Sequence, residues 1–123
     1  MKTLATLTAC LFGFAGVCHA AQIASPSIYA DGTQHVALCL VYNGGNTPQT
    51  VRVQLFDEAG TVLADSGTCN ATPGGQFCSI VKIGISNDNA YACAATAASV
   101  TQLRGTIILQ DDSDRSLRSA PLR

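Results

Sequence analysis

The stretch QHVALCLVYN, residues 34–43, decides the fold that this sequence predicts. Successive side chains of an extended strand point to opposite faces, so Leu38 and Leu40 share one face while Cys39 and Val41 share the other. Both faces are apolar, whereas a half-exposed strand alternates apolar with polar residues. The turn-forming run NGGNTP follows at once. We therefore expect a central β-strand, covered on at least one face, that leads into a hairpin.

Short strands separated by turns account for the rest of the chain. Residues 49–57 alternate most cleanly between apolar and polar side chains, and residues 77–85 read as another buried strand. Residues 21–30 read as an edge strand, because Pro26 cannot donate to a ladder. The other expected strands are 61–65, 90–95, 103–110 and 116–122, with 66–76 as a loop. Seven or eight strands spaced by about ten residues predict an all-β, two-sheet antiparallel sandwich.

The first twenty residues have the features of a secretory signal. A single lysine precedes an apolar stretch over 4–17, and the small residues Cys18 and Ala20 stand at the positions that a signal peptidase reads. We expect cleavage near Ala20, which releases residues 21–123 as one β-sandwich domain without a transmembrane segment, secreted or periplasmic. A lipoprotein signal centred on Cys10 is the alternative, and it would leave Cys18 as an unpaired thiol.

Charge and composition exclude some partners. Seven basic and eight acidic residues give a net charge of −1, and the basic residues are scattered along the chain. Without a basic face there is no electrostatic footprint for phosphate, so we expect no nucleic-acid partner. The expected partner is an unknown protein or cell-surface partner, and the pattern specifies no oligomeric state.

The four cysteines after the signal predict two disulfides, because an even number is typical of small exported chains. Four cysteines allow three pairings. Cys69 and Cys78 bracket eight residues, so a local bridge between them closes easily and leaves Cys39 to pair with Cys93. A metal site is the alternative, and the absence of CxxC spacing disfavours it. We expect no metal and no cofactor.

Tyr91 lies two residues before Cys93, the spacing of the tyrosine corner and second cysteine in immunoglobulin domains, although this chain has no tryptophan. Four features carry a broader resemblance: ALCLVYNGGNTPQTVRVQLFDEAGTVL at 37–63, the loop with Pro-Gly-Gly that Cys69 and Cys78 bound, AYACAATA at 90–97 and LRGTIILQD at 103–111. They resemble small exported bacterial proteins with a predicted immunoglobulin-like sandwich fold and no assigned activity. The resemblance implies a fold and a compartment and supplies no catalytic residue.

No set of residues converges on a catalytic scheme. His35 is the one histidine after the signal, and it stands at the entrance to a strand without a GxSxG nucleophile motif. Asp57 and Glu58 occupy a hairpin turn, where acidic residues stay solvated. The acidic run at 111–114 lacks the glycine and distal glutamate of a calcium loop and reads as a polar turn. We therefore expect a protein that is not an enzyme.

Contact through the surface is the remaining hypothesis. Tyr29 and Phe56 are expected to be exposed and to form a contact patch, with most other aromatic residues in the core. We predict an interaction or structural module of the cell envelope or the extracellular space. The alternative is a small secreted hydrolase or enzyme inhibitor that works through the loop between Cys69 and Cys78. An exposed apolar patch would favour the module, and a cleft joining His35 to a carboxylate would favour the enzyme.

Overall fold

The computed structural model describes residues 20–113 and 115–123. The expected signal therefore lies, apart from Ala20, outside the described residues. Within them the chain forms ten strands and no helix. The strands are β1 (Ala21–Ala24), β2 (Ile28–Ala30), β3 (Val36–Asn43), β4 (Gln49–Asp57), β5 (Val62–Asp65), β6 (Cys69–Ala71), β7 (Cys78–Ile83), β8 (Asn89–Ala97), β9 (Leu103–Gln110) and β10 (Ser116–Leu122).

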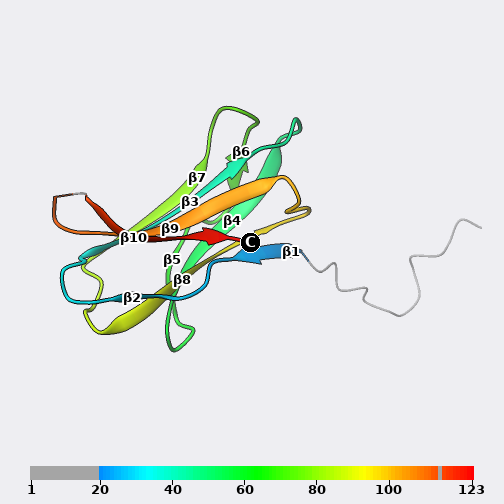
Figure 1. The fold of residues 1–123 in the computed structure, drawn as a ribbon. Coiled ribbons are helices and arrows are strands. Elements are labelled where there is room, and N and C mark those ends of the chain that lie inside the picture. Colours follow the sequence, from blue (N-terminus) through cyan, green and yellow to red (C-terminus); the bar gives the residue numbers. More distant parts are fainter. Residues whose placement is uncertain (1–19, 114) are drawn as a thin grey trace, which may run out of the picture.

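The strands make two antiparallel sheets (Figure 1). The six-stranded sheet has the order β1-β8-β4-β5, with β2 also paired to β8 and β6 also paired to β4. The four-stranded sheet has the order β10-β9-β3-β7. The prediction of an all-β protein built from two antiparallel sheets is confirmed.

The predicted count of seven or eight strands is wrong, because ten are present in the described residues. The break at Pro26 divides the expected first strand into β1 and β2, and both pieces pair with β8. The expected loop at 66–76 contains β6, which pairs with β4. Both extra strands are short, and short strands leave little alternation to recognise in a sequence.

Strand β3 is central in its sheet, as the opening stretch predicts. It pairs with β7 on one side and with β9 on the other. Its inward side chains, among them Ala37, Cys39 and Val41, are fully buried. They pack against the inward apolar side chains of β4 and β8, so the core is the layer between the two sheets.

Two disulfides join the sheets. Cys39 on β3 is bonded to Cys93 on β8, with 6.0 Å between the Cα atoms. Cys69 on β6 is bonded to Cys78 on β7, with 5.9 Å between the Cα atoms. These are the two pairs that loop length favours. Each bridge runs from one sheet to the other, so the layers are covalently fixed at two places.

One side of the sandwich is closed by backbone hydrogen bonds between its sheets. The N–H of Ala24, the last residue of β1, donates to the Arg123 carbonyl at 3.1 Å, and the Arg123 N–H donates to the Ala24 carbonyl at 3.0 Å. Figure 1 shows the end of β10 beside β1. Strand β10 is therefore covered at its outer edge, and β7 is the edge of the four-stranded sheet that has no strand partner.

The expectation that residues 77–85 form a buried strand is wrong. Strand β7 is an edge strand in which Cys78 and Ile80 are buried, while Val81 and Ile83 are exposed. The bridge to Cys69 requires Cys78 to face inward, and alternation then turns Val81 and Ile83 outward. The sequence makes both faces apolar, but the six-stranded sheet covers just one of them.

Candidate interaction surface

The outward side of the four-stranded sheet is apolar. We define the outer apolar face by eight residues: Val36, Leu38, Leu40 and Tyr42 on β3, Phe77 beside β7, Val81 and Ile83 on β7, and Ile108 on β9. Four are largely exposed: Ile83 at 75 %, Phe77 at 57 %, Tyr42 at 54 % and Val81 at 54 %. Contiguous exposed apolar patches on soluble domains typically mark contact sites.

Strand register arranges this face in rows. Leu38 lies between Val81 and Ile108, and the row is apolar across all three strands. Leu40 lies between Ser79 and Thr106, so the next row has a small side chain on either side of Leu40. The two central rows therefore differ in side-chain volume and carry no charge.

The two end rows of the outer apolar face carry larger side chains than the row of Leu40. Val36 lies between Ile83 and Gln110. At the other end Tyr42 lies beside Arg104, and Phe77 adjoins Cys78, the partner of Val41. The expectation that most aromatic residues are in the core is wrong, because Tyr91 is buried whereas Tyr42 and Phe77 belong to this face.

Lys82 separates Val81 from Ile83 on the edge strand. Its side chain belongs to the inward phase of β7, opposite buried Ala37 on β3, and is half-buried. An inward-pointing lysine on an edge strand opposes the addition of a further strand, since pairing would bury its charge between the layers. The edge is thus protected while the face beside it stays open.

The outward side of the six-stranded sheet is different in character. Strand β8 presents small residues there, Ala90, Ala92 and Thr96 among them. Tyr29 is opposite Ala90 and Phe56 is opposite Ala92, so the register places both aromatic residues on this one side, flanking β8.

The two aromatic residues are unequally exposed. Tyr29 is 46 % exposed, and its hydroxyl donates to Asp88 at 3.3 Å. Desolvation and the Asp88 carboxylate raise the pKa of Tyr29. Phe56 is half-buried. Two large apolar side chains, Tyr29 and Val62, are largely exposed on this sheet, against four on the outer apolar face.

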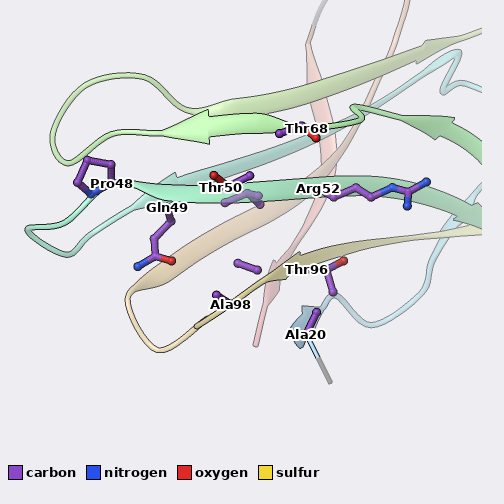
Figure 2. A pocket seen from close by; sticks show the side chains of 10 residues that line it. Ala20, Pro48, Gln49, Thr50, Arg52, Thr68, Thr96 and Ala98 are labelled. Carbon is purple, nitrogen blue, oxygen red and sulfur yellow. The ribbon is translucent and has the colours of Figure 1, made fainter. Parts of the chain in front are cut away.

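A depression of about 620 Å³ lies on the same side, at the ends of β4 and β8. Figure 2 shows Thr50 and Arg52 on β4 and Thr96 on β8 around it. The Arg52 guanidinium already binds both carboxylate oxygens of Asp65. Its hydrogen bonds hold the pKa of Asp65 well below the ordinary value. The charge in this depression is therefore engaged within the protein.

His35 lies near a carboxylate at a solvent-exposed position. Its Nε2 lies 3.9 Å from Asp112 Oδ2, and the two side chains are 42 % and 81 % exposed. Neither the depression beside Arg52 nor a second cavity of about 420 Å³ near Leu103 includes them. The pair therefore lies outside both of these hollows, whereas catalytic sites typically occupy a concave pocket.

Two other carboxylates noted in the sequence, Asp57 and Asp111, serve local turns. Asp57 accepts hydrogen bonds from the backbone N–H groups of Ala59 and Thr61 at 3.0 and 2.8 Å. Asp111 accepts from the backbone and side chain of Arg115, and these bonds lower its pKa. Among the described residues no group of three His, Cys, Asp or Glu side chains could hold a metal ion.

The outer apolar face could have been found from the sequence, but it was missed. The signal is a strand with two apolar faces in a chain without a helical pattern to cover the second one. Residues 34–43 and 77–83 both have this property. With two sheets and no covering helix, one face of such strands must lie outside.

Comparisons with known proteins add little. No protein-family model and no curated protein matches the chain. A solved structure described as Thermotoga maritima 1070 is similar at 18 % identity, with 85 % of this chain and 89 % of that chain covered and a TM-score of 0.44. A likeness at this level does not transfer function. In the described part of the chain no helix is long and apolar enough to cross a membrane.

Proposed function

We propose that this chain is an exported immunoglobulin-like β-sandwich that acts as an interaction module of the cell envelope or extracellular space through its outer apolar face. The observation that carries the proposal is the exposure of Tyr42, Phe77, Val81 and Ile83 on one side of one sheet. A monomer gains nothing from leaving these side chains in water, since each would be stabilised by burial. A partner that covers them accounts for their presence.

The immunoglobulin-like assignment is supported by two contacts. The Cys39–Cys93 bridge links β3 in one sheet to β8 in the other. Tyr91 is buried, and its hydroxyl donates to the backbone oxygen of Ser86 at 2.8 Å. A tyrosine before the second cysteine that bonds to the backbone a few residues upstream is the tyrosine corner of immunoglobulin-like domains.

Two disulfides are consistent with an extracellular or periplasmic location, because such bonds persist in oxidising compartments. The hydrolase alternative has less support, since His35 and Asp112 meet outside the two cavities. The inhibitor alternative rests on the bridged loop between Cys69 and Cys78. That loop ends at Phe77, which already belongs to the outer apolar face.

A matched pair of variants tests the proposal. Val81 on the outer apolar face and Val62 on β5 are both edge-strand valines, 54 % and 45 % exposed. Tagged, oxidised wild-type protein and the Val81→Asp and Val62→Asp variants are incubated with the medium and envelope fraction of the native culture. Retained macromolecules, including untagged copies of the chain, are identified by mass spectrometry. We expect retention by wild type and Val62→Asp and its loss in Val81→Asp; equal retention by all three proteins would refute the proposal.

A further inference from the structure

We propose that the outer apolar face binds a second copy of this chain, so that two four-stranded sheets pack face to face. The two-fold axis runs within the interface and across the strands, and it reverses the order of the rows in the second copy. The inference rests on the proposed function, because it names the partner of the same surface. Face-to-face packing of sheets about 10 Å apart is also how each copy builds its own core.

The central rows are complementary to each other. A two-fold axis between Leu38 and Leu40 places the bulky row of one copy on the narrow row of the second. Val81 then lies over Ser79 of the second copy, and Ile108 lies over Thr106 of the second copy. Each contact occurs twice, as an isologous interface requires. At these two flanking positions large side chains meet small ones, which favours dense packing between two sheets.

The end rows obey the same symmetry. Ile83, the most exposed residue of the face, lies over Phe77 of the second copy, and Val36 lies over its Tyr42. Arg104, beside Tyr42, approaches the end that carries Asp112, two residues beyond β9. The opposite alignment, with the axis along β3, would set each row on the same row of the second copy, so that Val81 would lie over Ile108 and Arg104 over Phe77. The reversed alignment is the one that sets Val81 and Ile108 on small side chains and brings Arg104 toward a carboxylate.

Lys82 opposes assembly through the exposed strand edge of the four-stranded sheet. Strand addition at β7 would bury the Lys82 ammonium, so the second copy is expected on the face.

The size of the sheet indicates how strong the dimer is. Four strands and four rows span about 500 Å² of sheet per copy, from a strand spacing of about 4.8 Å and about 3.4 Å per residue. Stable complexes bury about 800 Å² per partner. The dimer is therefore expected to be reversible, forming at about micromolar concentrations or above.

Sedimentation velocity of the exported, oxidised protein over a concentration series tests the inference. Wild type is expected to shift from monomer to dimer. Val81→Asp buries two carboxylates in the symmetric interface and is expected to weaken dimerisation by about 100-fold or more. Val62→Asp, the same change on the other sheet, is expected to dimerise like wild type. Far-UV circular dichroism and non-reducing peptide mapping verify that each variant is folded with both bridges.

A compensating variant tests the reversed alignment itself. Val81→Asp combined with Ser79→Lys places each new carboxylate over a new ammonium of the second copy. We expect the double variant to recover dimerisation relative to either single variant. Recovery supports the row-on-row arrangement, whereas a double variant weaker than both singles overturns it.

The outcomes separate this inference from the proposed function. A wild type that stays monomeric throughout, or a Val81→Asp variant that dimerises like wild type, overturns the second-copy proposal. If wild type is monomeric yet retains another macromolecule in a Val81-dependent manner, the interaction module stands with a different partner. If wild type neither dimerises nor retains anything in a Val81-dependent manner, both proposals fall.

Discussion

The Ser25 hydroxyl takes the place of a backbone carbonyl as the acceptor for the Cys93 N–H. The Ser25 N–H donates to the Cys93 carbonyl at 2.9 Å, as in a regular ladder. The Cys93 N–H, however, donates to the Ser25 hydroxyl at 2.9 Å, because the chain turns away toward Pro26. The hydroxyl therefore completes the hydrogen bonding of the strand that carries the inter-sheet disulfide.

Loss of this hydroxyl leaves a buried donor without a partner. We expect Ser25→Ala to lower the free energy of unfolding by about 1–3 kcal/mol, the penalty for an unsatisfied buried polar group. Urea unfolding of the oxidised protein measures the change. Ser27→Ala, in the exposed part of the same break, is the control and is expected to change stability by less than about 0.5 kcal/mol. Equal effects of the two substitutions would contradict the role given to Ser25.

The exposure of Ile83 predicts that its side chain contributes little to the stability of the monomer. We expect Ile83→Ala to change the free energy of unfolding by at most about 0.5 kcal/mol, measured on monomeric protein at low concentration. Ile107, on β9 and fully buried, is the matched control. Ile107→Ala is expected to cost about 2–5 kcal/mol through lost burial and a cavity. A large loss of stability in Ile83→Ala would mean that another part of the chain covers the outer apolar face.

The two disulfides are expected to differ in their contribution to stability because they close loops of different length. The Cys39–Cys93 bridge spans a sequence separation of 54 and the Cys69–Cys78 bridge spans 9. The loop-entropy model gives about 4 kcal/mol for the first and about 3 kcal/mol for the second, as upper values. Guanidinium unfolding of the Cys39→Ala/Cys93→Ala and Cys69→Ala/Cys78→Ala proteins compares them. The reverse order of stabilities would contradict the assignment of the longer bridge as the main constraint.

Acid sensitivity is expected from Asp65. Hydrogen bonds from Arg52, the Gly67 N–H and Gln54 lower its pKa from the ordinary value of 3.8. A carboxyl whose pKa is depressed on folding stabilises the protein above its unfolded pKa, and this contribution is lost as the pH falls toward the folded value. The denaturant concentration at the midpoint of unfolding should therefore decrease as the pH is lowered from about 5 toward about 2. This decrease should be less steep in Asp65→Asn. An unchanged slope in that variant would show that Asp111 or Asp31, whose pKa values are also lowered, carries the acid dependence.

The sequence predicts most of the fold because its strongest patterns lie in the long strands. The two-sided apolar run of β3 indicates a central strand, and the alternation in β4 indicates one buried face; both are present. Alternation alone does not tell which phase of a two-sided apolar strand faces inward. For β7 the phase follows from the bridge at Cys78, so the buried set is Cys78 and Ile80 and the exposed set is Val81 and Ile83.

The sequence predicts a contact patch at Tyr29 and Phe56 and most other aromatic residues in the core, because aromatic residues usually are buried. The register places Tyr29 and Phe56 on the six-stranded sheet, whereas Tyr42 and Phe77 are exposed on the four-stranded one. Their exposure depends on how many layers the protein has, which is a property of the assembled sheets and not of any one segment.

The inward lysine of β7 has a consequence for aggregation. Val81 and Ile83 give the edge strand β7 the apolar composition of segments that stack into cross-β fibrils. Lys82, between them in sequence, points inward, and the addition of a strand at this edge would remove its ammonium group from water. In the proposed dimer, association through the outer apolar face ends with a closed pair of copies. The protein can therefore accumulate without growing into filaments.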